Sequence, residues 1–469
     1  MVVGEPAETR PPARGGADRD ATHDGSDAWL YGWALGYAAV GAASLLVPLY
    51  ALDLGAGAFV VSLIAATAAL AGVPGAVLWG RLVTRTQRRR PFVLVALGLS
   101  AGVFLTLPFL GSPWTVLAAN AVLWFVIAAA APVLNLIVVE GYEPRAWTGR
   151  FGRLNHYQGY GWLAGLVAGG VWSALASTRF GLAPIAAKRL FFVVGAVAAL
   201  VGALVVLARY PEPVTTSERR FRRLSRRIRA VGGGPSRAAR AVSYGPARTY
   251  WALRAVGGGR SGDSRQPAEG TFTRLRRRFS GRLMRYLAAA TLFFTGFAAF
   301  FGPLPAYLVD VGYATDEVFA LFILSAAAAA AAYARAGTAA ASHGLYRLQT
   351  GALLLRAGAF PAVAVAGTAI APPAGLAVVG LLLLLVGATW AVVAVTATGV
   401  VSELAPESVR AEALGAYTAV GSLGGGIGSV VGGGIADVFG YVSAFVVAGG
   451  LVALAASLTV GRVKQDAAT

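Results

Sequence analysis

Apolar stretches, each about the length of a membrane span, recur along this chain of 469 residues. A helix needs ~20 mostly apolar residues to cross a bilayer. We place such stretches at 29–50, 59–79, 91–110, 114–139, 152–174, 190–208, 286–308, 317–336, 348–370, 374–401, 413–436 and 441–461. Only 13% of the residues are charged, whereas a soluble domain has roughly 25%. The sequence therefore predicts an all-α polytopic membrane protein with about twelve transmembrane helices.

A long polar gap divides the predicted spans into two sets. We expect a disordered cytoplasmic tail at 1–27, because this segment lacks the apolar core of a cleavable signal peptide. The other expected units are an N-terminal six-helix bundle at 28–208, a basic cytoplasmic linker at 209–285, a C-terminal six-helix bundle at 286–461 and a cytoplasmic tail at 462–469.

Positive charge predicts the orientation of the chain in the membrane. The linker at 209–285 holds twenty Arg and four acidic residues, and this net charge of +16 supplies most of the formal +19. Loops rich in Lys and Arg stay on the cytoplasmic side. An N-terminus inside the cell places 36 of the 40 Lys and Arg residues there. We therefore expect an integral protein of the cell membrane with both termini cytoplasmic.

The basic linker has two interpretations. Apolar residues recur in it at helical spacing among the arginines, which predicts amphipathic helices lying on anionic lipid. Alternatively, the linker is solvated and its charge only enforces the topology. No nucleic-acid-reading motif accompanies the charge, so we do not expect nucleic acid as a partner.

An internal repeat relates the two sets of spans. Pro48, Tyr50, Asp53 and Gly55 recur 257 positions later, and a second block beginning at Glu140 recurs after 263 positions. The later residues of these two blocks are Pro305, Tyr307, Asp310 and Gly312 in the first, and Glu403, Gly415, Gly424, Gly428, Gly432 and Gly433 in the second. The chain is therefore expected to contain two pseudo-symmetric six-helix bundles, with a solute site between them.

The chain resembles the major facilitator superfamily over roughly residues 29–461, because of this duplication and of short motifs. The loop that follows the second span is similar to the G-x-L-x-D-R-x-G-R-R-R signature of that family, although Thr84 and Gln87 replace the Asp and the second Gly. The resemblance implies a cytoplasmic gate whose arginines pair with carboxylates at inner helix ends. The predicted gating residues are Gly80, Arg81, Arg85, Arg88, Arg89, Glu140 and Glu403.

Small residues at four-residue spacing occur in the fifth and eleventh spans and let helix backbones approach closely. The fifth-span stretch is similar to a pattern of drug/proton antiporters, although Leu166 replaces its Pro. Close helix packing explains the spacing about as well as antiport does. The predicted packing residues are Gly161, Gly165, Gly169, Gly424, Gly428 and Gly432.

The resemblance also indicates which spans line the solute site, namely the first, fourth, seventh and tenth. Their polar and aromatic residues near mid-depth, our candidate solute contacts, are Tyr37, Asn120, Trp124, Thr295, Thr389 and Trp390. Asn120 stands where many proton-coupled relatives carry an Arg, which argues against proton antiport. Arg356 lies in the ninth span. We expect its side chain to extend toward the headgroups or to form a structural pair, and we favour these two roles rather than that of an anion site.

The predicted function is secondary active or facilitative transport of a small solute by alternating access, with efflux of amphiphilic compounds as one form of it. The alternatives are uptake of a sugar or organic anion, or a non-transporting receptor or scaffold. Transport is driven either by the solute's own gradient or by an ion gradient, for which a proton or a sodium ion is the candidate, and the protein is expected to be a monomer. Catalysis, cofactors and metal sites are not expected, because three histidines and sparse acids assemble no such site.

Overall fold

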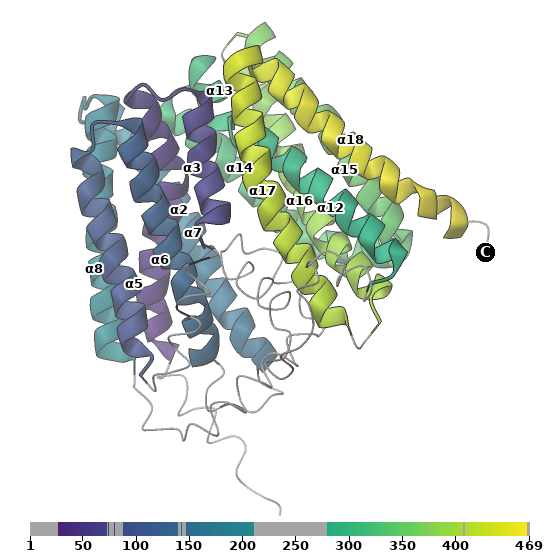
Figure 1. Ribbon diagram of the computed structural model, residues 1–469. Coiled ribbons are helices and arrows are strands. Elements are labelled where there is room, and N and C mark those ends of the chain that lie inside the picture. The colour runs from purple at the N-terminus through teal and green to yellow at the C-terminus, as the bar shows by residue number, and fades with distance from the viewer. Residues whose placement is uncertain are drawn as a thin grey trace, which may run out of the picture.

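The computed structural model describes residues 27–210 and 279–466, apart from gaps at 73, 75–78, 80–87, 139–141, 143–146, 372 and 407–408. Helices account for nearly all of these residues and form two bundles (Figure 1). The first bundle contains α2 (Trp29–Asp53), α3 (Ala58–Leu70), α5 (Arg90–Thr106), the short 3₁₀ helix η2 (Leu107–Phe109), α6 (Pro113–Ile137), α7 (Trp147–Thr178) and α8 (Pro184–Arg209). The second contains α12 (Gly281–Phe301), α13 (Leu304–Asp310), α14 (Thr315–His343), α15 (Leu345–Ala369), α16 (Ala374–Leu404), α17 (Arg410–Phe439) and α18 (Tyr441–Asp466).

Ten helices among the described residues are long and apolar enough to cross a membrane. The second predicted span is represented by the shorter apolar helix α3. The fifth is α7, whose 32 residues start with a polar stretch that lowers its hydropathy. The all-α membrane architecture is therefore confirmed, while the count of twelve spans stays a prediction.

The seventh predicted span differs from the expected continuous helix at 286–308. It begins earlier, at Gly281, where the Ser280 hydroxyl accepts a hydrogen bond from the Leu283 N–H over 3.3 Å. It is also divided into α12 and α13. Pro303 separates the two helices, because proline has no N–H to continue the hydrogen-bond ladder.

Equivalent residues of the repeat make equivalent contacts in the two bundles. The hydroxyl of Tyr50 donates to Leu110 O at 2.8 Å, just after η2, and that of Tyr307 donates to Ala364 O of α15 at 2.7 Å. Gly55 and Gly312 follow α2 and α13 with φ of 89° and 96°. Only glycine adopts this backbone conformation readily, which explains why both copies of the repeat carry it.

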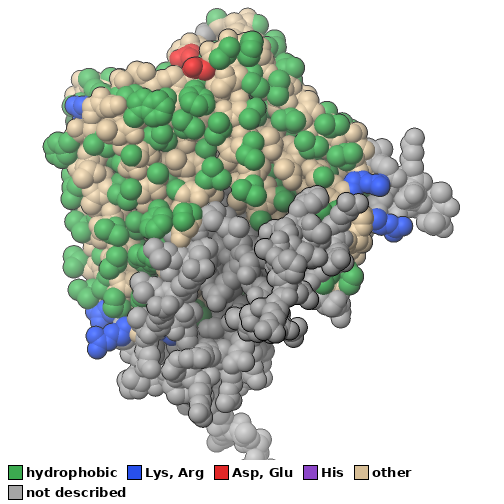
Figure 2. Space-filling view, in the orientation of Figure 1, with side chains coloured by type: hydrophobic (Ala, Val, Ile, Leu, Met, Phe, Trp, Pro, Cys, Tyr) green, Lys and Arg blue, Asp and Glu red, His purple; other side chains and the backbone are tan. Residues whose placement is uncertain are grey.

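The bundle surface matches a lipid environment. Large apolar side chains are exposed along the flanks, for example Leu204 and Leu381, which are 62% and 67% exposed. Figure 2 shows hydrophobic side chains over the body of the molecule and charged ones gathered near its two ends. We call the end that carries Arg88, Arg89 and Arg90 the inner end, because the charge distribution predicts that it faces the cytoplasm.

The two bundles contact each other along α3 and α17, and along α7 and α14. At the outer end, a Cβ atom built on Gly57 would lie 2.8 Å from Asp437 Oδ1, and toward mid-depth one built on Gly426 would lie 2.6 Å from the Leu70 side chain. Below these contacts α5 and α6 of the first bundle and α12 and α18 of the second diverge toward the inner end, at the bottom of Figure 1. The described helices therefore adopt an arrangement that is closed at the outer end.

Candidate functional site

Aromatic rings from three helices form a cluster in the N-terminal bundle. Tyr37 of α2 lies 6.0 Å from Trp162 of α7, and Trp162 lies 6.1 Å from Trp124 of α6, measured between ring centroids. Tyr37 and Trp124 are predicted solute contacts that the fold brings together through Trp162. Trp162 is not among the predicted solute contacts, although it directly follows Gly161, which sets α7 close to α2.

A matching aromatic cluster lies in the C-terminal bundle. Phe294 of α12 stands 257 positions after Tyr37 and is therefore its repeat equivalent. Its ring centroid lies 5.6 Å from Tyr417 of α17 and 6.5 Å from Trp390 of α16. Phe297 of α12 approaches Trp390 to 5.9 Å. Of these residues, only Trp390 was predicted as a solute contact.

The polar candidates use their side chains for bonds inside the bundles. Asn120 of α6 is buried and donates to Thr67 Oγ1 at 2.7 Å and to Ile64 O at 3.1 Å, which ties α6 to α3. The hydroxyls of Thr295 and Thr389 each donate to a carbonyl of their own helix, at 2.8 Å. These bonds provide a structural role for each, and solute contact by them stays a prediction.

The Arg356 side chain is buried in the C-terminal bundle, so the expectation that it extends to the headgroups is wrong. The residue is only 1% exposed, and its guanidinium carbon lies 4.1 Å from the ring centroid of Phe297. The same carbon lies 5.6 Å from Phe360 and 5.7 Å from Trp390. Arg356 is therefore a buried cation among aromatic rings, because the rotation of α15 directs it into the bundle.

The predicted inner gate is only partly described. Gly80, Arg81, Arg85 and Glu140 lie outside the described residues. Arg88 and Arg89 directly precede α5, the first exposed and the second 2% exposed, and Glu403 is exposed near the end of α16. Charge pairing across the inner face by these residues stays a prediction.

The predicted packing glycines bring equivalent helices together. A Cβ atom built on Gly165 of α7 would lie 1.9 Å from Ala38 O of α2, and one built on Gly428 of α17 would lie 2.1 Å from Thr295 O of α12. Ala38 and Thr295 are themselves repeat equivalents, 257 positions apart. Gly161, Gly424 and Gly432 face the same partner helices, whereas Gly169 faces Phe319 of α14 in the other bundle.

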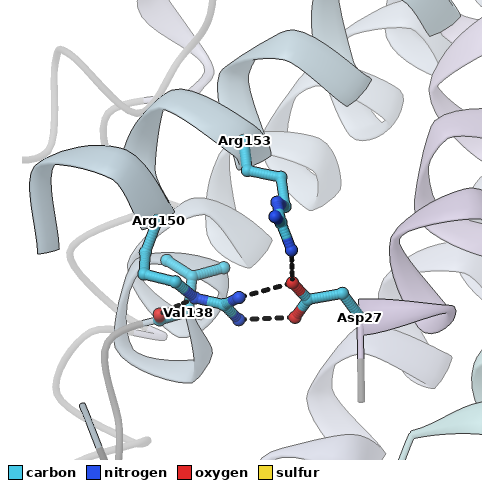
Figure 3. A network of polar contacts seen from close by, with 4 residues as sticks. All are labelled: Asp27, Val138, Arg150 and Arg153. Atoms are coloured by element: carbon cyan, nitrogen blue, oxygen red, sulfur yellow. Dashed lines mark hydrogen bonds and ion pairs between the residues drawn. The ribbon is translucent and has the colours of Figure 1, made fainter. Parts of the chain in front are cut away.

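An ion-pair network at the inner end was not found from the sequence (Figure 3). Both carboxylate oxygens of Asp27, just before α2, accept hydrogen bonds from Arg150 of α7, and Arg153 Nη1 bonds the same carboxylate at 2.5 Å. Arg150 Nε also donates to Val138 O after α6 at 3.0 Å, and its guanidinium lies 4.2 Å from the Tyr142 ring. The network therefore joins the inner ends of α2, α6 and α7.

Asp27 stays ionised at neutral pH despite its burial. Burial raises its pKa, but the hydrogen bonds and charges of Arg150 and Arg153 more than offset this and hold the pKa below its ordinary value of 3.8. The stabilisation from this group is thus complete above about pH 4 and is lost as the pH falls through the lowered pKa of the folded protein.

We expect Asp27→Asn to destabilise the purified protein by about 2 kcal/mol at pH 7, because it leaves two arginines without their carboxylate. Thermal unfolding measured at several pH values checks this, and the difference in stability from the wild type should narrow below about pH 4, where the carboxylate of the unfolded wild-type chain begins to protonate. Arg153→Gln serves as a graded control, since this side chain is 46% exposed and should cost less than Arg150→Gln. If Asp27→Asn lowers the free energy of unfolding by the same amount at pH 7 and at pH 3, the ion-pair explanation is contradicted.

Comparisons with known proteins agree with this architecture. The sequence profile of the Major Facilitator Superfamily matches residues 30–429. A mutant of the nucleoside transporter NupG superposes with a TM-score of 0.69 at 11% identity, covering 93% of this chain and 99% of that one. A bacterial homologue of the human lysosomal transporter Spinster, in an inward-facing and occupied conformation, gives 0.67 at 14% identity, covering 96% and 98%.

A third solved structure, the human organic anion transporter MFSD10, covers 96% of this chain and 100% of its own with a TM-score of 0.51 at 16% identity. No curated protein sequence matches the chain. At these identities the structural likeness concerns the fold.

Proposed function

This chain belongs to the Major Facilitator Superfamily, and on that premise we propose that it moves a small organic solute across the membrane by alternating access. The main support is the arrangement of the two bundles, which contact each other at the outer end and diverge toward the inner end. Rocking of two repeats about a site near mid-depth exposes that site to one side of the membrane at a time. The described helices correspond to the inward-facing member of such a cycle.

We place the solute between the two aromatic clusters. Tyr37, Trp124 and Trp162 form the wall from the N-terminal bundle, and Phe294 and Trp390 belong to the wall from the C-terminal bundle. Aromatic side chains offer a large apolar face, and Tyr and Trp add a hydrogen-bonding group at its edge. These walls suit a planar or amphiphilic solute.

Both termini and the basic linker are placed in the cytoplasm, on the support of the Lys and Arg distribution. This orientation makes the inner end of the bundles the cytoplasmic one. The closed outer contacts then separate the proposed site from the external solution.

Counterflow in proteoliposomes tests the proposed transport. Ligands are first selected from a panel of sugars, drugs, organic anions and amino acids by the rise in melting temperature that they cause in the purified protein. We expect a ligand loaded inside the vesicles to drive transient uptake of its labelled form, because both use one alternating site. Saturable binding without counterflow would instead support a receptor or scaffold that retains the fold.

A further inference from the structure

Two contacts between the bundles lie in the outer half of the molecule, and the internal repeat relates them. Ser62 of α3 and Phe319 of α14 are repeat equivalents, 257 positions apart, and each is the fifth residue of its helix. Ser62 faces Gly433 of α17, and Phe319 faces Gly170 of α7. These two glycines are also equivalents, 263 positions apart. Ser62 and Phe319 therefore occupy matching places where one bundle touches the other.

We propose that the two contacts act in opposite directions on the outer gate: burial of Phe319 favours the closed outer end, whereas burial of the Ser62 hydroxyl disfavours it. This inference rests on the proposed alternating access and concerns the balance between its outward-open and outward-closed states. It assigns opposite effects to two residues that are equivalent in the repeat.

Phe319 is an apolar side chain that the other bundle covers. It is 0% exposed, although it lies only about one turn from the outer end of α14. A Cβ atom built on Gly169 would lie 2.7 Å from Cε1 of its ring, and one built on Gly170 would lie 3.2 Å from its Cβ. The ring thus packs directly on the backbone of α7. Separation of α7 from α14 exposes it to water, so the hydrophobic effect favours the closed outer end.

Ser62 is a polar side chain buried at the matching place. It is 0% exposed, and its hydroxyl has no hydrogen-bond partner among the residues that the structure describes. A Cβ atom built on Gly433 would lie 2.5 Å from Ser62 Oγ, and one built on Gly302, between α12 and α13, would lie 3.2 Å from it. A hydroxyl buried without a partner loses the hydrogen bonds that it makes to water. Closure of the outer end therefore carries a cost that the open arrangement avoids.

The two effects together set the balance between the end states. A conformational equilibrium responds only to differences in free energy between its two states. A transporter that rocks about a central site must reach both states in every cycle. The contact of Phe319 alone would favour the closed outer end, and the Ser62 hydroxyl reduces this preference, so that the outer end can open again.

Distances between spin labels on two outer loops test the inference in the full-length protein in nanodiscs. The labels are attached to Gly111→Cys, between η2 and α6, and to Ala371→Cys, between α15 and α16. Both positions are exposed, and the chain has no native cysteine. The longer of the two label distances reports the open outer end, and the shorter one the closed outer end.

We expect Phe319→Ala to raise the ratio of open to closed protein at least tenfold, which corresponds to about 1.4 kcal/mol. Phe319→Leu keeps a smaller apolar side chain and should raise the ratio less, and it replaces Phe319→Ala if that variant does not fold. Ser62→Ala is then added to the Phe319 variant, in which the open state is populated. It should lower the ratio again by about tenfold, because it removes the unpartnered hydroxyl.

Two controls on α5 separate these effects from a general loss of packing, because α5 packs against α6 and α8 of its own bundle. Ser100→Ala removes a buried hydroxyl that donates to a carbonyl of its own helix at 2.8 Å. Phe104→Ala removes a ring that is 1% exposed. Both controls should leave the ratio of open to closed protein unchanged, even where they lower the melting temperature.

The inference is overturned if the Phe319 variants leave the ratio unchanged, if Ser62→Ala leaves it unchanged or raises it, or if the controls shift it equally. Counterflow distinguishes this inference from the proposed function. If solute is exchanged but the ratio responds to neither residue, transport stands and the assignment of the two contacts fails. If the ratio responds as expected but no solute is exchanged, the two contacts stand and the proposed transport fails.

Discussion

Replacement of Gly165 by alanine is expected to destabilise the protein by about 3 kcal/mol or more, which is at or above the upper end of typical overpacking costs. The new Cβ atom would lie 1.9 Å from Ala38 O and 2.8 Å from Ala42 N, both backbone atoms of α2. Backbone atoms cannot rotate away as a side chain does, so the two helices must move apart. Close backbone approach is the main source of attraction between helices in lipid, and the separation removes it.

Thermal unfolding of the purified protein measures this effect, and a loss of this size lowers the melting temperature by about 3 °C or more in a chain of 469 residues. Gly159→Ala is the matched control, because it lies on the same helix and a Cβ atom there meets no atom within 4 Å. This control should be neutral or slightly stabilising, since alanine favours helix over glycine.

The internal repeat provides a second comparison. Gly428→Ala should be as damaging as Gly165→Ala, because its Cβ atom would lie 2.1 Å from Thr295 O. A melting temperature for Gly165→Ala equal to that of Gly159→Ala would show that the contact between α2 and α7 does not stabilise the bundle.

Much of the fold follows from local sequence patterns, because in lipid every span satisfies its backbone within one helix. The long apolar stretches therefore predict the helices, and the repeat predicts that Tyr50 and Tyr307 occupy equivalent places. The break between α12 and α13 was missed, although Gly302 and Pro303 directly follow one another in the sequence and mark it.

The surroundings of individual side chains could not be predicted in the same way. The Asp27 carboxylate meets Arg150 across 123 residues of sequence, and no local pattern links them. The burial of Arg356 depends on how far α15 is rotated against α12 and α16, which a one-dimensional sequence does not contain. Trp162 was missed because it lies in the fifth span, whereas only the first, fourth, seventh and tenth spans are expected to line the solute site.

A disulfide across the outer end is expected to abolish solute exchange. Gly57 precedes α3 of one bundle, and Asp437 lies near the outer end of α17 of the other. A Cβ atom on Gly57 would lie 3.8 Å from Cγ of Asp437 and more than 4 Å from its Cβ, so a small movement brings cysteines at the two positions to the Cβ separation of about 3.5–4.5 Å that a disulfide needs. The bond would keep the outer ends together and prevent the site from opening outward.

The chain contains no native cysteine, so the introduced pair reacts alone. Each single variant, Gly57→Cys or Asp437→Cys, controls for the substitution itself. A disulfide within one bundle controls for cross-linking, and Thr350→Cys with Thr459→Cys provides it, because these two hydroxyl oxygens of α15 and α18 lie 2.9 Å apart. This second cross-link should leave exchange intact, since each bundle moves as a unit.

Counterflow by the Gly57→Cys/Asp437→Cys protein, oxidised and then reduced in the same proteoliposomes, tests most directly whether the two bundles must separate at the outer end during transport. Alternating access predicts that oxidation stops exchange, that reduction restores it, and that the control cross-link does neither. Undiminished exchange by fully cross-linked protein would show that the two bundles need not separate at the outer end.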